Sequence, residues 1–206
     1  MVHSGDGLVG VGDLFDQGVV FTDLESANRE LARLRELAIR DPLTGLYNRR
    51  FMEDELARQT RHATSGRRPL VVAMIDLDDF RGYNDRHGHP AGDQALRQTA
   101  TLIQGFRAAT DVACRYGGEE FLLIMPDTTA AAASVRLDAL RAALAVAAVH
   151  HEGRPLDPVT ASIGVAEAPP DGGPVAGLLD AADRALYRAK RRGRNRVETV
   201  AFGSPS

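Results

Sequence analysis

The 206-residue sequence contains no tryptophan, one cysteine and one lysine, and it has no hydrophobic run long enough to cross a bilayer. A single cysteine excludes an internal disulfide, and Cys114 lies within an apolar run, which is typical of a small buried side chain in a reducing compartment. The first residues lack the basic start and apolar stretch of a secretion signal. We therefore expect a cytoplasmic protein with no membrane segment.

The charge balance gives little support for nucleic-acid binding. The net charge is -3 and the pI is near 6.1, although the segment after Arg184 is locally very basic. A hydrophobic content of 44% in a chain of this length is sufficient for one sizeable core. We expect one globular domain with an appendage and no nucleic-acid partner.

The appendage is expected at the N-terminal side. Residues 1–21 are rich in glycine, show no clear period and are too few for a sensor domain, so we expect a flexible lead or the remnant of an upstream region, with the input signal coming from elsewhere. Residues 22–40 then show an apolar heptad pattern that predicts an amphipathic stalk helix. Its a and d positions are Leu24, Ala27, Leu31, Leu34 and Ala38. This helix either packs on its own domain or dimerises as a coiled coil.

After Asp41 and Pro42 the sequence predicts an alternation of helices and strands. Asn48 is a candidate N-cap for the first helix. The predicted elements are a helix over 49–64, a strand over 70–75, a helix over 80–87, a turn over 88–93, a helix over 94–107, a hairpin around 115–121, a helix over 128–149, a strand over 159–166, a helix around 178–189 and a strand over 197–201. Residues 202–206 are expected to be a disordered tail.

The hairpin carries the first acidic pair. Two apolar runs flank residues 115–121 (RYGGEEF), and the two glycines are expected to adopt positive φ and to allow close approach of another group. Glu119 and Glu120 then lie side by side at the tip. Because like charges repel, a bound cation is the economical explanation for two adjacent acids. The alternative is a polar hairpin tip whose acids are solvated.

A second acidic cluster follows the buried strand over 70–75. We expect Asp76 to be a metal ligand, and we expect Asp78 and Asp79 mainly to cap the next helix. Oxygen ligands from two segments suit Mg²⁺, which is usually held by one or two carboxylates together with substrate phosphates. The site therefore predicts a nucleotide, with Lys190 and Arg194 as candidate triphosphate contacts. The alternative for the basic segment is a solvated helix end.

His87 and His89 flank a glycine in the predicted turn over 88–93. No cysteine or further histidine is nearby to complete a zinc site, so we interpret the pair as surface groups in the absence of other information.

Taken in order, these motifs resemble those of the GGDEF-domain diguanylate cyclases, which join two GTP molecules into cyclic di-GMP with release of two pyrophosphates. The matching segments are residues 41–50 (DPLTGLYNRR), 76–93 (DLDDFRGYNDRHGHPAGD), 115–121 (RYGGEEF), 162–165 (SIGV) and 182–196 (ADRALYRAKRRGRNR). The resemblance implies an α/β fold over residues 41–201. The expected architecture is a ferredoxin-like, palm-type α+β sandwich, with a mainly antiparallel central sheet flanked by helices and preceded by the stalk helix.

The resemblance also implies roles for individual residues. Metal ligation is implied for Asp76, the Leu77 carbonyl, Glu119 and Glu120, with Mg²⁺ as cofactor and Mn²⁺ as a substitute. The implied catalytic residues are Glu119, Glu120 and Arg81; the implied substrate contacts are Phe80, Asn84 and Asp93 for the guanine side, His89 for the ribose side, and Lys190 and Arg194 for the phosphates. Catalysis is expected to require a homodimer, since each domain holds one GTP. Which glutamate assists deprotonation stays open.

Two positions depart from the family pattern. Arg81 stands where lysine is usual, which keeps the charge but brings a larger planar group. Ala108 replaces the arginine of the family's inhibitory Arg-x-x-Asp motif, while Asp111 is present. Arg107 is one position early, and it would point about 100° away unless the end of its helix is irregular. We therefore expect weak or absent product inhibition.

Two alternatives remain open from the sequence. One is a catalytically silent GGDEF module that binds GTP or cyclic di-GMP and signals by protein contact; the intact acids count against it. The other is a monomeric, polymerase-like nucleotidyl transferase. Its specific activity would not depend on protein concentration.

Overall fold

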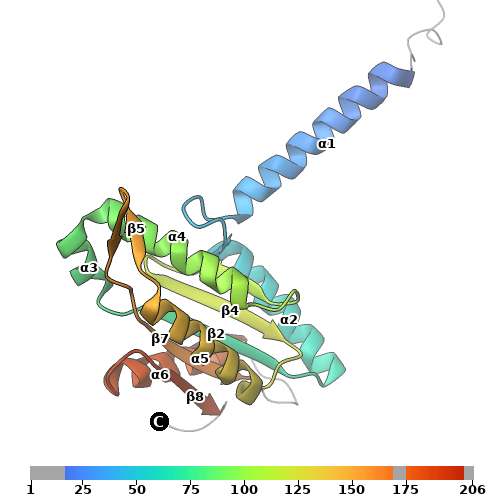
Figure 1. The fold of residues 1–206 in the computed structure, drawn as a ribbon. Helices are drawn as coiled ribbons and strands as arrows, with labels where there is room; N and C mark the ends of the chain where they lie inside the picture. Colours follow the sequence, from blue (N-terminus) through green and yellow to red (C-terminus); the bar gives the residue numbers. More distant parts are fainter. Residues whose placement is uncertain (1–16, 169–174, 202–206) are drawn as a thin grey trace, which may run out of the picture. The chain divides into compact units, whose positions relative to one another are not determined.

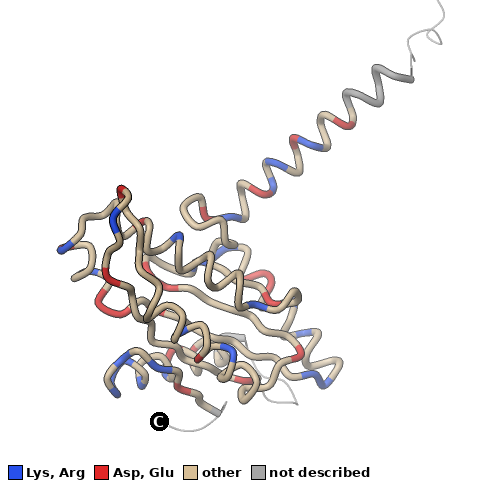
Figure 2. The backbone as a smooth tube through the Cα atoms, viewed as in Figure 1, with Lys and Arg blue, Asp and Glu red and all other residues tan. Residues whose placement is uncertain are grey.

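The computed structural model describes residues 17–168 and 175–201. The chain divides into two units, Met1–Ala38 and Ile39–Ser206. Helix α1 (Gln17–Ile39) begins five residues before the predicted start at Thr22, so residues 17–21 of the expected lead are helical, whereas residues 1–16 lie outside the described residues. Acidic and basic residues alternate along α1 (Figure 2), and its leucines are exposed: Leu24 by 58%, Leu31 by 51%, Leu34 by 50% and Leu37 by 63%.

The second unit is built on a six-stranded mixed sheet (Figure 1). Its strands are β1 (Tyr47–Asn48), β2 (Leu70–Leu77), β3 (Val112–Arg115), β4 (Glu120–Pro126), β7 (Ala161–Glu167) and β8 (Val197–Ala201), in the spatial order β1-β3-β4-β2-β7-β8. The three inner pairings are antiparallel, and the two edge pairings are parallel. A separate hairpin consists of β5 (Val149–His151) and β6 (Arg154–Leu156). The predicted fold class is confirmed.

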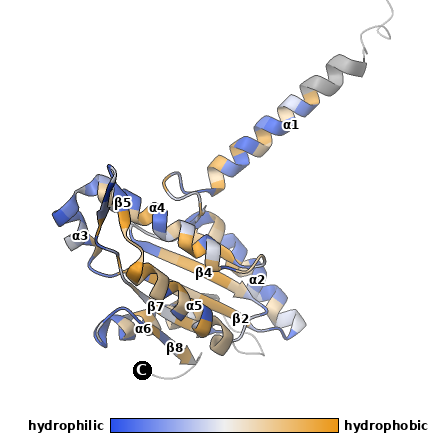
Figure 3. Ribbon diagram, viewed as in Figure 1, coloured by the Kyte–Doolittle hydropathy of each residue, from blue (hydrophilic) through white to orange (hydrophobic). Residues whose placement is uncertain are grey.

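Helices cover both faces of this sheet, which explains why β2 is buried along its whole length and is apolar except at Asp76. Alternate residues of β2 point to opposite faces. Val71, Ala73 and Ile75 join one core with α4 (His89–Phe106) and α5 (Ala130–Val146), together with residues of α3 (Phe80–His87). Leu70, Val72 and Met74 join the other core with α2 (Arg49–Gly66) and α6 (Val175–Arg191). Figure 3 shows the hydrophobic residues concentrated in the central strands.

Several predicted boundaries hold, and others change for local reasons. Asn48 caps α2, since its side chain accepts a hydrogen bond of 3.0 Å from the Phe51 amide. The predicted turn over 88–93 is wrong, because α4 begins at His89 directly after Gly88, which takes φ +84° and breaks the chain from α3. Pro90 is compatible with that start, because the first helical turn has no need of its missing N–H. In the described part of the chain, no helix is long and apolar enough to span a membrane.

Candidate active site

Strand pairing brings the two acidic clusters together. Asp76, near the end of β2, lies opposite Glu120 of β4 on one side and opposite Ser162 of β7 on the other. The next residue, Leu77, donates its amide to the Glu119 carbonyl at 3.3 Å. The predicted metal ligands therefore lie side by side on adjacent strands, although they are more than forty positions apart in the sequence.

These carboxylates are electrostatically costly in the absence of a cation. Asp76 is only 7% exposed, and burial raises its pKa even though Lys190 Nζ lies 2.7 Å from its Oδ2 atom. Burial also raises the pKa of Glu120, and the negative charge of Asp76 adds to that effect. Two neighbouring acids that resist ionisation are typical of a site that binds a positive ion or transfers protons.

The Gly-Gly turn is not built as the sequence suggested. Neither Gly117 nor Gly118 adopts a left-handed backbone, so the expectation of positive φ is wrong. The expected close approach does occur at Gly117, where an added methyl group would lie 2.5 Å from Glu120 Oε2. The amides of Tyr116 and Gly117 both donate to the Glu120 carbonyl, at 2.8 and 3.2 Å. Gly117 thus makes room for the Glu120 carboxylate.

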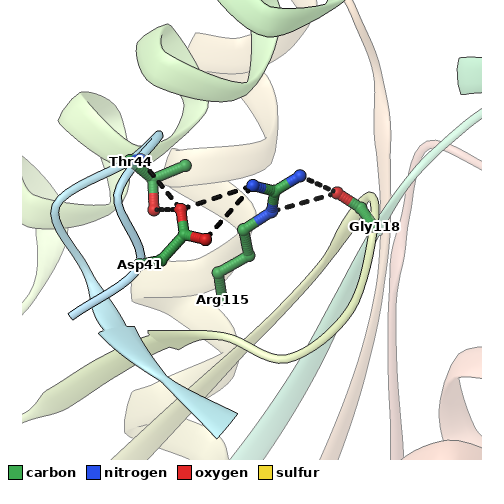
Figure 4. Close-up of polar contacts among 4 residues, drawn as sticks. All are labelled: Asp41, Thr44, Arg115 and Gly118. Carbon is green, nitrogen blue, oxygen red and sulfur yellow. Dashed lines mark hydrogen bonds and ion pairs between the residues drawn. The ribbon is translucent and has the colours of Figure 1, made fainter. Parts of the chain in front are cut away.

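A guanidinium holds the other side of this turn (Figure 4). Arg115 donates to the Gly118 carbonyl through Nε at 3.1 Å and Nη2 at 2.7 Å, and its Nη1 atom lies 3.3 Å from both carboxylate oxygens of Asp41. Thr44 donates its amide and its hydroxyl to the same carboxylate, at 2.8 and 2.7 Å. This network was not predicted from the sequence, although Asp41 and Arg115 both lie in segments that match the family motifs.

A cavity of about 470 Å³ adjoins the turn. Its lining residues are Phe80, Arg81, Asn84, Asp85, His89, Gly92, Asp93, Leu96, Arg115, Gly118 and Glu119. Every residue predicted to contact the base or the ribose is in this lining, together with Arg81 and Glu119. The Asn84 Oδ1 atom is buried and has no hydrogen-bond partner among the described residues, so it is available to a donor on a ligand. Gly92 is needed beside it, because an added methyl group would overlap Asn84 Oδ1.

The remaining predicted residues lie outside the lining of this cavity. Lys190, in the last turn of α6, contacts Asp76. Arg194 lies in the turn between α6 and β8, and its charge is among those that oppose the rise in the pKa of Asp76. The basic residues thus gather near the carboxylates, and the base-side residues gather in the cavity, with Glu119 between the two groups.

The donor set fits a divalent cation that also binds the substrate. Across residues 17–168 and 175–201, no three side chains of His, Cys, Asp and Glu are grouped closely enough to hold a metal ion by themselves. Mg²⁺ does not require such a group, since it commonly takes one or two carboxylates and completes its shell with water and phosphate oxygens. Asp76 and Glu120 are the candidates for those carboxylates, since they lie opposite each other on paired strands and burial raises the pKa of both.

Two expectations about neighbouring residues are wrong. Asp78 does not cap α3; its carboxylate accepts hydrogen bonds from Thr160, Ser162 and the Asn195 amide. Asp79 occupies the N-cap position in a left-handed conformation, with φ +50° and no capping hydrogen bond from its side chain.

The end of α4 is irregular, which is the exception allowed for the orientation of Arg107. The helix ends at Phe106 and Arg107 is extended, so Arg107 is not rotated by a helical step. Its Nη1 atom donates to the Asp111 main-chain carbonyl at 3.1 Å. The Asp111 carboxylate itself is fully buried and contacts Arg136 Nη1 at 2.9 Å and the Ala108 amide at 2.8 Å.

The sheet order, the paired acids and the polar cavity define an α/β domain with an acidic site at the end of its central strands. Residues 38–196 match the family model described as "Diguanylate cyclase, GGDEF domain". The chain belongs to the GGDEF family.

Individual relatives agree with this assignment. Response regulator PleD of Caulobacter vibrioides is 42% identical over 167 residues, which cover 79% of this chain and 36% of PleD. Diguanylate cyclase DgcP of Pseudomonas aeruginosa is 38% identical over 182 residues, which cover 86% of this chain and 26% of DgcP. The chain therefore spans about a quarter to a third of the length of these curated relatives.

Among solved structures, the coiled coil and GGDEF domain of DgcB from Caulobacter crescentus, in complex with c-di-GMP, superposes with a TM-score of 0.83 at 33% identity. The match covers 89% of this chain and 97% of that one. Diguanylate cyclase SiaD of Pseudomonas aeruginosa, in complex with its activator SiaC, has a TM-score of 0.77 at 34% identity, covering 92% of this chain and 73% of that one.

Proposed function

We propose that this chain is a diguanylate cyclase that condenses two GTP molecules into cyclic di-GMP and two pyrophosphates. The observation that carries the proposal is the pairing of Asp76 with Glu120 beside Lys190, next to a cavity lined by Asn84 and Asp93. One end of this arrangement suits a metal-bound triphosphate, and the other suits a base with several hydrogen-bond donors. The similarity to named diguanylate cyclases supports the same reaction.

The base-side residues account for a preference for guanine. The Asp93 carboxylate suits the N1 and N2 donors of guanine, and Asn84 Oδ1 offers a buried acceptor without a partner among the described residues. Adenine presents a different pattern of donors and acceptors, so it would leave these oxygens poorly matched. Phe80 lines the same cavity, and His89 is assigned to the ribose side.

The acidic residues would hold the cofactor. Asp76, the Leu77 carbonyl, Glu119 and Glu120 are the proposed ligands of Mg²⁺, with Mn²⁺ as a substitute. When bound, the cation neutralises negative charge that develops on the phosphoryl oxygens. Lys190 and Arg194 bind the triphosphate, and Arg81 contributes a further positive charge at the mouth of the cavity.

The reaction is an in-line displacement at an α-phosphate. The 3′-oxygen of one GTP forms a bond to the α-phosphorus of the other, and the bond from that phosphorus to the pyrophosphate oxygen breaks. The 3′-hydroxyl proton is lost to a nearby base, for which Glu119 and Glu120 are the candidates. The arginines and Lys190 stabilise the charge on the departing pyrophosphate.

Each domain is proposed to hold one GTP, so two copies must face each other to join them. Helix α1 supplies a means of dimerisation, because the four leucines Leu24, Leu31, Leu34 and Leu37 are each at least half exposed. Three of them occupy the heptad positions that a coiled coil would bury. A homodimer formed through α1 would set how the two catalytic domains meet.

Product inhibition is proposed to be weak. The Asp111 carboxylate that would take part in an inhibitory Arg-x-x-Asp motif is fully buried, and its Oδ2 atom already contacts Arg136 and the Ala108 amide. We expect turnover to change little when cyclic di-GMP is added to the reaction. Strong inhibition at low micromolar product would contradict this.

The direct test is to incubate the purified protein with GTP and Mg²⁺ or Mn²⁺ and to identify the product by chromatography. Cyclic di-GMP is expected from the wild type and not from Glu120→Gln. If the wild type forms no product at high protein concentration, the chain is instead a catalytically silent GGDEF module.

A further inference from the structure

The Asp78 side chain joins three segments of the domain. Its Oδ2 atom accepts the Thr160 hydroxyl at 2.7 Å and the Asn195 amide at 3.0 Å, and its Oδ1 atom accepts the Ser162 hydroxyl at 2.7 Å. Its own amide donates to the Thr160 carbonyl at 2.8 Å. Both carboxylate oxygens are therefore engaged within the protein, which leaves Asp78 poorly suited to bind a metal ion or a substrate.

The contact with Asn195 falls on an unusual turn. Between α6 and β8, three consecutive residues have positive φ: Gly193 at +109°, Arg194 at +61° and Asn195 at +44°. Residues other than glycine rarely adopt this conformation, and they keep it only where surrounding contacts enforce it. Three contacts from outside the turn reach Arg194 and Asn195: Asp78 to the Asn195 amide, Arg141 Nη1 to Asn195 Oδ1 at 2.9 Å, and the Arg194 amide to the Ala189 carbonyl at 3.0 Å. At the end of the turn, the Ile163 amide donates to the Arg196 carbonyl at 2.9 Å.

This turn carries the basic residues of the candidate site. Lys190, in the last turn of the preceding helix α6, contacts Asp76, and Arg194 lies within the turn. Of these three contacts, Asp78 makes the one that comes from the end of β2, whereas Arg141 belongs to α5 and Ala189 to α6. Asp78 is also two residues from Asp76, so one short segment contributes both an acid of the site and the anchor for its basic turn.

We propose that Asp78 is a positioning residue that holds the turn of residues 192–196 so that Arg194, together with Lys190, faces the β- and γ-phosphates of the nucleotide. This inference rests on the proposed function, in which Lys190 and Arg194 bind the triphosphate. Asp78 acts through the turn and does not touch the substrate. Removing the Asp78 carboxylate should lower the affinity for the β- and γ-phosphates and leave the affinity for the guanosine part unchanged.

The test compares two ligands on two matched variants. Asp78→Asn removes the negative acceptor with little change in shape, and Asp79→Asn makes the same change at an adjacent exposed carboxylate whose ion-pair partner is Arg86. Isothermal titration calorimetry in Mg²⁺ would measure binding of α,β-methylene-GTP, which cannot release pyrophosphate, and of GMP, which lacks the outer phosphates.

For Asp78→Asn we expect about a tenfold loss of affinity for the GTP analogue and less than about a twofold change for GMP, as for a weakened charge-assisted contact. Asp79→Asn should bind both ligands as the wild type does. Amide hydrogen exchange should also be faster around Asn195 in Asp78→Asn, with unchanged exchange in the core strands.

Equal affinities of wild type and Asp78→Asn for the analogue would overturn this inference alone. An equal loss for the analogue and for GMP would show a general structural role and would overturn it too. Failure of the wild type to bind the analogue would overturn the proposed function, and with it any role of Asp78 in nucleotide binding.

A milder variant covers the case in which Asp78→Asn does not fold. Ser162→Ala removes one hydroxyl donor and keeps the carboxylate and its charge. We expect a loss of about two- to threefold for the analogue and none for GMP, as for one neutral hydrogen bond. An unchanged or a non-selective response in this variant would contradict the proposal.

Discussion

At the scale of single residues, the site is defined by carboxylates that the fold places close together, which reduces the stability of the folded protein. Asp76 and Glu120 face each other across two strands, and the pKa of each is raised by burial. A raised carboxyl pKa means that the ionised form is less favourable in the folded protein than in the unfolded chain. Such groups reduce stability unless a bound cation compensates their charge, and a cost of this kind is common at functional sites.

Replacing Glu120 by glutamine should therefore stabilise the metal-free protein. We expect Glu120→Gln to raise the Tm at neutral pH by about 2–4 °C, as for a gain of about 1 kcal/mol in a domain of this size. Mg²⁺ with α,β-methylene-GTP should raise the Tm of the wild type further and that of the variant less. Differential scanning calorimetry measures both effects.

The control for this prediction is Glu53→Gln, which removes the same charge from an exposed ion pair with Arg49. That change should leave the Tm nearly unaltered. A fall in the Tm of Glu120→Gln would contradict the view that this carboxylate is held unfavourably.

Asp41 behaves in the opposite way. Burial alone would raise its pKa, but the hydrogen bonds from Thr44 and the charge of Arg115 outweigh burial and lower the pKa of this carboxyl. A folded pKa below the unfolded value of about 3.9 stabilises the protein above that value, and the benefit is lost as the pH falls through the folded pKa. Asp41→Asn should thus cost about 1–2 kcal/mol at pH 7 and progressively less below about pH 4.

Urea unfolding of wild type and Asp41→Asn at several pH values would measure this difference. Thr44 can still donate to the asparagine oxygen, so the loss reports mainly on Arg115. A destabilisation of equal size at pH 7 and pH 3 would show that the charge of Asp41 plays no part.

The sequence indicated the chemistry of several single residues and missed their partners. Acids at a strand end and at a hairpin are visible as a pattern, so Asp76, Glu119 and Glu120 were accessible. The contact of Arg115 with Asp41 spans 74 positions, and that of Asp78 with Asn195 spans 117. No local pattern encodes such pairs, because they depend on which strands become neighbours.

At the scale of elements, the packing of α6 on the sheet depends on one glycine. An added methyl group on Gly164 of β7 would overlap main-chain atoms of Ala182 and Leu186 in α6. Main-chain atoms cannot move aside as a flexible side chain can. The helix that carries Lys190 can therefore approach the strand closely only because this position lacks a Cβ atom.

Gly164→Ala should consequently be strongly destabilising, by about 2–4 kcal/mol or more, through overpacking. The matched control is Gly105→Ala in α4, where an added methyl group meets nothing within 4 Å. That change should stabilise by about 0.5–1 kcal/mol, because alanine favours the helix. Chemical denaturation of the two variants measures both values. A small effect of Gly164→Ala would show that α6 can shift outward freely.

Long elements with a clear period were predictable, and short ones were not. Strand β2 and helix α2 follow from an apolar run and from a capped amphipathic segment. Strand β1 has two residues; it pairs with β3, and its Tyr47 also forms an isolated bridge with Arg40. The β5–β6 hairpin replaces the end of a helix predicted to reach residue 149, because α5 ends at Val146 and two short strands follow, of which β5 buries Val149 in the core.

At the scale of the whole molecule, the proposed reaction requires two copies of the chain, each of which holds one GTP. The chain divides into a unit that contains most of α1 and a unit that contains the GGDEF domain, and the leucines in the described part of α1 are exposed. The net negative charge of the sequence argued against nucleic-acid binding, and the apolar heptad pattern predicted helix α1. The orientation of two copies depends on contacts between their surfaces, which neither the sequence nor a single copy of the chain contains.

The most direct test is therefore the rate of cyclic di-GMP formation per unit of protein, measured over a range of protein concentrations with GTP and Mg²⁺. If the chain is a diguanylate cyclase that works as a dimer, the product is cyclic di-GMP, and the specific activity rises with the dimer fraction measured by sedimentation. We also expect that the double variant Leu31→Ser, Leu34→Ser shifts this rise to higher concentration, whereas Ala32→Ser does not. A specific activity independent of concentration, or no cyclic di-GMP at the highest concentration, would contradict this proposal.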